Sequence, residues 1–78
     1  MSRPKPMASP ALLTPREREC MDAYLFHGSQ KGVARSLGIA EATVQVHMRR
    51  LRQRLGVSLM VHAVVEWTVY RTANQETA

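Results

Sequence analysis

A chain of 78 residues can form only one small domain, and the core that it can bury leaves an isolated monomer marginally stable. A disulfide within the chain is excluded because Cys20 is the only cysteine, and three scattered histidines offer no zinc-binding spacing, so oligomerisation is the remaining source of added stability. The net charge is +5, and six of the eleven Lys and Arg residues fall within residues 30–56, against one acid, Glu41. Such a basic segment is typical of a nucleic-acid binder, although a solvated basic face is the plainer alternative.

Residues 1–11 are predicted to form a disordered basic arm. Residues 1–10 contain three prolines, carry Arg3 and Lys5, and have little to bury. The folded domain is expected over residues 12–72, followed by a frayed tail at residues 73–78. No repeat or strand pattern is visible, so the sequence predicts an all-α fold of four helices.

The first helix is predicted from Pro15 to about His27. Thr14 is a good N-cap, Pro15 suits the first helical position, and Glu17 completes a capping box. Gly28 is expected to end the helix. Cys20 falls in the apolar stripe, where a small buried hydrophobe is expected rather than a reactive thiol.

A short second helix is predicted over residues 30–37, with Gly38 at its end. Val33 and Ala34 belong to its apolar stripe. Gly32 lies inside it and costs about 1 kcal/mol relative to Ala. Two interpretations stay open, a close backbone approach that needs glycine or a tolerated weakness.

The third helix, predicted over residues 41–55 and ending at Gly56, has two different faces. Its apolar residues recur with the rhythm of one buried stripe: Val44, Met48, Leu51 and Leu55. Another face is polar and basic and carries Gln45, Val46 and Arg49. Because Gln can pair bidentately with adenine and Arg with guanine, this face suits the DNA major groove. Ala40 stands where an N-cap Ser or Thr is expected, so the helix lacks about 1 kcal/mol of stabilisation that a capping side chain would supply.

The fourth helix, predicted over residues 59–71 with Ser58 as its N-cap, is apolar nearly all round. One stripe can pack on the other helices, and a leftover apolar face usually marks an interface. The alternative is that the N-terminal arm covers it. We expect a second copy of the chain to contact this helix at Leu59, Met60, Ala63, Val64 and Trp67.

Four short segments together resemble the LuxR-type (NarL/GerE-type) helix-turn-helix domain. They occur in the family's order and at its spacing, and the resemblance covers about residues 12–70: residues 13–19, 33–39, 43–47 and 55–57. In size the chain is similar to the family's stand-alone, GerE-type members. The resemblance implies a four-helix transcription factor whose second helix is a scaffold, whose third is the recognition helix, and whose fourth forms a homodimer.

The same resemblance implies roles for individual residues on double-stranded DNA. Gln45, Val46 and Arg49 match base-contacting positions, and Val46 could meet a thymine methyl group. Lys31, Thr43, His47 and Arg50 match positions that contact the DNA backbone, and from its place on the basic third helix we expect a further backbone contact from Arg54. A two-fold symmetric dimer would then bind an inverted repeat.

A second hypothesis is a non-enzymatic interaction module that heterodimerises with a larger LuxR-type regulator and inhibits it. RNA polymerase is a further candidate partner. No nucleophile–base set or phosphate-binding loop is visible, so we expect no enzymatic activity, cofactor or metal. The apolar runs are too short to span a membrane, and we expect a cytoplasmic, nucleoid-associated protein.

Overall fold

The computed structural model describes residues 9–77, with side chains described up to residue 74. Within that range the chain forms a short 3-10 helix followed by four α-helices, and no strand: η1 (Pro10–Leu12), α1 (Pro15–His27), α2 (Gln30–Leu37), α3 (Glu41–Leu55) and α4 (Met60–Thr77). The predicted all-α, four-helix fold is therefore confirmed. No helix in the described part of the chain is long and apolar enough to cross a membrane.

Local capping sets the ends of the first three α-helices. The Thr14 hydroxyl accepts a hydrogen bond from the Glu17 amide at 3.1 Å, and the Glu17 carboxylate accepts one from the Thr14 amide at 3.0 Å, which completes the predicted capping box. The Ser29 hydroxyl caps α2 through the Gly32 amide at 3.0 Å. Left-handed glycines then end α1, α2 and α3: Gly28, Gly38 and Gly56.

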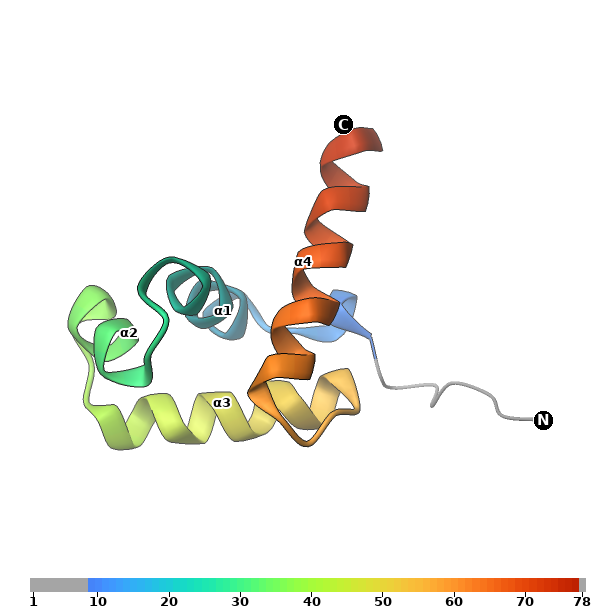
Figure 1. Ribbon diagram of the computed structural model, residues 1–78. Helices are drawn as coiled ribbons and strands as arrows, with labels where there is room; N and C mark the ends of the chain where they lie inside the picture. The colour runs from blue at the N-terminus through green and yellow to red at the C-terminus, as the bar shows by residue number, and fades with distance from the viewer. Residues whose placement is uncertain (1–8, 78) are drawn as a thin grey trace.

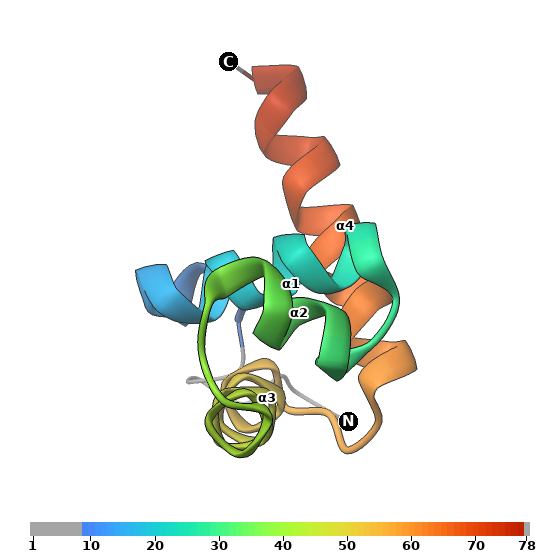
Figure 2. The ribbon, with the colours of Figure 1, turned by 90° about the vertical axis from the view of Figure 1, so that its left-hand side faces the viewer.

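α1, α2 and α3 enclose most of the core, to which α4 adds Ala63 and Trp67. α3 runs beneath α1 and α2, and Figure 2, which looks along α3, shows the other two lying above it. The side chains between them have no exposed surface: Cys20, Met21, Val33, Val44, Met48 and Leu51. Burial raises the pKa of the Cys20 thiol, which fits the expected small buried hydrophobe.

Gly32 of α2 lies close against His27 at the end of α1. A Cβ atom added there would lie 2.6 Å from the Cβ of His27 and 3.2 Å from the Ser29 hydroxyl oxygen. No real Cβ comes so close, so only glycine fits without a shift of α1. Of the two interpretations left open by the sequence, the structure supports the close approach.

α4 packs one side against the bundle and then projects past the other helices (Figure 1). The Trp67 indole donates a hydrogen bond to the Asp22 carboxylate on α1 at 2.9 Å, and Arg71 lies 3.6 Å from the same oxygen. The Trp67 ring stacks on Tyr70 with centroids 5.6 Å apart. These contacts orient α4 relative to α1.

Both ends of α4 differ from the prediction. Leu59, not Ser58, takes the N-cap position, because its carbonyl accepts a hydrogen bond from the Ala63 amide at 3.1 Å. The helix then continues to Thr77, beyond the predicted end at Arg71 and through most of the segment expected to fray. The extension has a simple reason, since residues 72–77 contain no glycine or proline to end a helix.

The last residues of the predicted disordered arm are ordered, because they belong to η1. Residues 10–12 form η1, where the Ser9 hydroxyl accepts a hydrogen bond from the Ala11 amide at 3.2 Å. The Ser9 amide donates to the Arg54 carbonyl at 2.9 Å, which fixes this segment to the end of α3. The rest of the predicted arm, residues 1–8, and residue 78 of the predicted tail lie outside the described residues.

Candidate nucleic-acid interface

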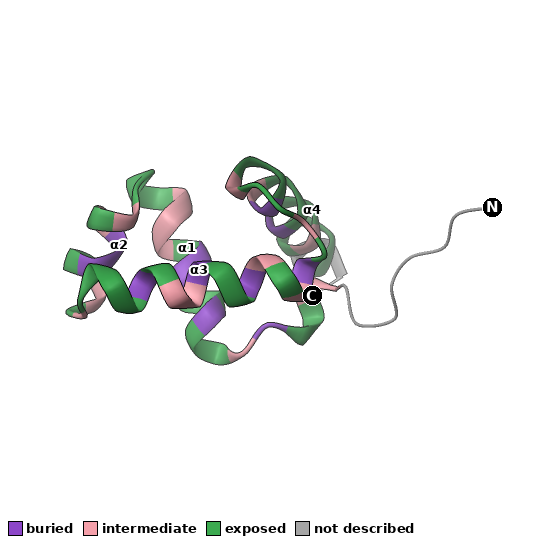
Figure 3. Ribbon diagram, turned by 90° about the horizontal axis from the view of Figure 1, so that it is seen from below, coloured by how far each residue is buried: buried purple, intermediate pink, exposed green. Residues whose placement is uncertain are grey.

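The candidate interface is the outer side of α3. The predicted apolar stripe is buried on the inner side, with Val44, Met48 and Leu51 fully covered and Leu55 almost so. Seen from below in Figure 3, α3 lies at the front of the molecule and no other helix crosses its outer side. A helix that packs on its neighbours through one apolar stripe and leaves its opposite side uncovered can enter a groove as wide as the major groove of DNA.

The three predicted base-contacting residues lie on or beside that open side. Gln45 and Arg49 are exposed, and Val46 is half-buried. At about 100° per residue, Val46 and Arg49 point away from the core, and Gln45 lies at the edge of the same surface. The side chains of Gln45 and Arg49 make no hydrogen bond or ion pair with any other described residue, so their donors are free to meet base edges.

The residues expected to contact the DNA backbone form a stripe along one flank of α3. Thr43, His47, Arg50 and Arg54 follow one another at intervals of four, three and four residues, which places them on the same side of the helix. Thr43 and Arg50 are exposed, and His47 is half-buried. Lys31 is exposed on α2 and makes no ion pair within residues 9–74. The four positions on α3 border its open side.

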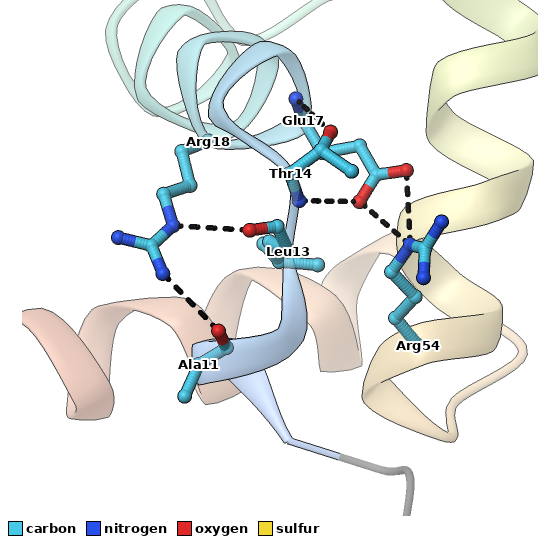
Figure 4. Close-up of polar contacts among 6 residues, drawn as sticks. All are labelled: Ala11, Leu13, Thr14, Glu17, Arg18 and Arg54. Carbon is cyan, nitrogen blue, oxygen red and sulfur yellow. Dashed lines mark hydrogen bonds and ion pairs between the residues drawn. The ribbon is translucent and has the colours of Figure 1, made fainter.

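Arg54 has a structural partner that the sequence analysis missed. Its Nε lies 2.9 and 3.1 Å from the two carboxylate oxygens of Glu17, whose residue is only 2% exposed (Figure 4). Glu17 therefore caps α1 and holds the last turn of α3 at the same time. No local pattern could have revealed this pair, because the two residues are 37 positions apart.

The start of α3 lacks a side-chain cap, as the sequence predicted. Ala40 has the extended backbone of an N-cap residue, with φ −71° and ψ 148°, but no side-chain hydrogen bond forms there. The first amides of α3 therefore have no side-chain acceptor, and their partial positive charge stays uncompensated by a cap.

The predicted dimer residues divide into two groups. Ala63 and Trp67 are 0% and 3% exposed, because they pack into the core of the same chain. Side chains so nearly covered offer almost no surface to a second copy, so their burial argues against these two assignments. Met60 and Val64 are half-buried against the same core, and Leu59 is exposed.

The opposite side of α4 carries an apolar stripe that the sequence analysis did not single out. Val61, Val65 and Val69 recur every four residues and are 61%, 54% and 63% exposed. We call these three residues the valine stripe. Because α4 is apolar nearly all round, only the structure could show which side faces the core.

The described residues hold no group of His, Cys, Asp and Glu side chains that could bind a metal ion. The site is instead a helix with a basic outer side, supported by two shorter helices. This arrangement defines a helix-turn-helix DNA-binding domain.

Comparisons with known proteins agree with that class. Residues 11–67 match the family described as bacterial regulatory proteins, luxR family. The chain is similar to the spore germination protein GerE of Bacillus subtilis, with 40% identity over 62 residues that cover 80% of this chain and 84% of GerE. It is also similar to the transcriptional regulatory protein MctR of Rhizobium johnstonii, with 39% identity over 46 residues.

The match to MctR covers 59% of this chain but only 22% of MctR, so the chain spans about a fifth of that relative. No solved structure matches the chain significantly. The chain belongs to the luxR family of bacterial regulatory proteins. Its class is therefore that of DNA-binding, helix-turn-helix regulators of transcription.

Proposed function

We propose that this protein binds a specific DNA sequence as a homodimer and regulates transcription from that site. The observation that carries the proposal is the open, basic outer side of α3, where Gln45 and Arg49 are exposed without partners. The helix enters the major groove with Gln45, Val46 and Arg49 against base edges. Arg49 pairs with guanine, Gln45 with adenine, and Val46 meets a thymine methyl group.

The flanking stripe positions the helix on the duplex. Lys31, Thr43, His47 and Arg50 contact phosphates, which fixes the register of the protein but carries no sequence information. The separation of roles is supported by the placement of Thr43, His47 and Arg50 on one flank of α3 rather than at the centre of its open side.

Dimerisation uses the valine stripe of α4 together with the exposed Leu59. Isolated apolar side chains on a surface are ordinary, but three in line on a helix that projects past the bundle favour an interface. A two-fold dimer places two copies of α3 about one turn of DNA apart, roughly 34–36 Å, and therefore binds an inverted repeat.

Two substitutions test the assigned roles on a duplex with the preferred site and on a scrambled duplex. Arg49→Ala should cost about 1–3 kcal/mol on the preferred site and much less on the scrambled one. Lys31→Ala should weaken binding to both duplexes alike. Arg16→Ala is the charge-matched control, because among the described residues Arg16 pairs only with Glu19, on the surface of α1. Equal effects of Arg49→Ala on both duplexes would contradict base contact.

A second candidate function is an interaction module that pairs with a larger LuxR-type protein and disables it. The valine stripe and the uncapped start of α3 favour it. Sedimentation of the pure protein separates the two candidates. A homodimer that selects DNA supports the first, and a monomer that ignores DNA but binds a larger relative supports the second.

A further inference from the structure

The direction in which α4 projects depends on a contact near its middle. The start of the helix is tied to α3 by a short connection, residues 56–59. Within the part of α4 whose side chains are described, only Ala63 and Trp67 are buried. Trp67 lies seven residues after Met60, about 10 Å along the helix axis, and beyond it α4 projects past the other helices (Figure 1). The contacts of Trp67 therefore bear directly on the direction of the projecting half.

One carboxylate of α1 meets α4 at this place. The Trp67 indole donates a hydrogen bond to Oδ1 of Asp22 at 2.9 Å, and Nε of Arg71, one turn further along α4, lies 3.6 Å from the same oxygen. Burial of apolar surface has no directional preference, so the packing of Ala63 and of the Trp67 ring would by itself let α4 tilt or rotate. A hydrogen bond is directional, and Asp22 therefore restricts both movements.

The valine stripe lies on the opposite side of α4 from Trp67. When a second copy packs on that stripe, a change in the direction of α4 changes the separation between the two copies of α3. Each α3 then lies about 17 Å from the two-fold axis, which is half of one turn of DNA. A tilt of about 10° displaces a point at that distance by roughly 3 Å, close to the rise of about 3.4 Å between successive base pairs. Small changes at Trp67 thus correspond to whole base pairs on DNA.

We propose that Asp22 is a positioning residue that sets the spacing between the two half-sites that the dimer accepts. This role rests on the proposed function, in which a homodimer formed through α4 binds an inverted repeat. Asp22 belongs to α1, on the inner side of α3 (Figure 2), and acts through Trp67 rather than on DNA. It therefore governs the distance between the half-sites, whereas the outer side of α3 governs their sequence.

Inverted repeats with constant half-sites and a spacer varied in steps of one base pair test this role. Wild-type protein should bind one spacer best. Asp22→Ala removes both contacts at an exposed helical position, where alanine favours the helix and the fold is preserved. Its preference for the best spacer over the neighbouring ones should fall about fivefold, the ratio that one hydrogen bond of typical strength supplies. Its affinity for a single half-site should not change. A spacer preference equal to that of the wild type would overturn the proposal.

Two further variants separate the hydrogen bond from the charge. Asp22→Asn keeps an acceptor oxygen for the Trp67 indole, so it should keep the spacer preference. Glu19→Ala is the matched control, because it removes an acid from the same helix at a similar side-chain exposure, 55% against 53%, and Glu19 pairs with Arg16 of its own helix. It should leave the preference unchanged. A loss in either variant as large as that in Asp22→Ala would overturn the proposal.

Residual dipolar couplings of the backbone amides measure the angle between α1 and α4 by NMR without DNA. In Asp22→Ala, we expect the couplings of α4 to depart from the wild-type orientation while those of α1, α2 and α3 still fit it. Unchanged couplings in α4 would overturn the proposal whatever the DNA assay gives. Changed couplings in a protein whose wild type binds no inverted repeat would contradict the proposed function, and the spacing role with it, but would confirm that Asp22 orients α4.

Discussion

Supplying the missing cap of α3 should stabilise the protein. Ala40 already has the extended backbone that an N-cap residue needs, with φ −71° and ψ 148°. The hydroxyl of Ser29 at the matching position of α2 accepts a hydrogen bond from the amide three residues later at 3.0 Å. Ala40→Ser should therefore reach the Thr43 amide without movement of the backbone, and we expect a gain of about 1 kcal/mol.

For a domain of this size that gain corresponds to a rise in Tm of roughly 4–8 °C. The assay is thermal and urea unfolding followed by circular dichroism at one fixed protein concentration, because dimerisation would make Tm depend on concentration. Ala42→Ser is the matched control. Ala42 is exposed in the first turn of α3, where serine cannot cap and should lower stability by up to about 0.7 kcal/mol. An unchanged or lower Tm for Ala40→Ser would refute the reasoning.

Four further substitutions test the packing and the backbone geometry. Gly32→Ala should destabilise the protein by roughly 1 kcal/mol or more, because the crowding at His27 Cβ outweighs the gain in helix propensity; a stabilised variant in urea unfolding would contradict the close approach. Trp67→Phe should cost about 1 kcal/mol through the lost hydrogen bond to Asp22, whereas Asp22→Asn keeps an acceptor and should change stability little. Gly28→Ala should cost about 1–2 kcal/mol because φ is +76° there, and an unchanged urea midpoint would argue against that backbone geometry.

The sequence predicted the first three α-helices well because their ends are set locally. A capping box at Thr14 and Glu17, a cap at Ser29 and left-handed glycines all act within a few residues of the helix that they bound. The buried stripe of α3 was likewise predictable, since its spacing is the helical repeat itself.

Features that depend on contacts between distant parts of the chain could not be predicted from the sequence. The pair between Glu17 and Arg54 joins two ends of the domain, and the contact of Gly32 with His27 depends on how two helices meet. For α4, whose apolar residues cover most of its circumference, periodicity alone could not separate the core side from the exposed side. Ala63 and Trp67 were therefore assigned to an interface although they belong to the core.

Selection of bound sequences from random DNA tests the central claim most directly. Wild-type protein and the Arg49→Ala variant are carried through the same rounds in parallel. The account predicts an inverted repeat with half-sites about 10 base pairs apart for the wild type. The variant should recover the same repeat with one base pair in each half-site relaxed. No enrichment by the wild type, or an identical repeat for both proteins, would contradict the claim that the outer side of α3 reads DNA sequence.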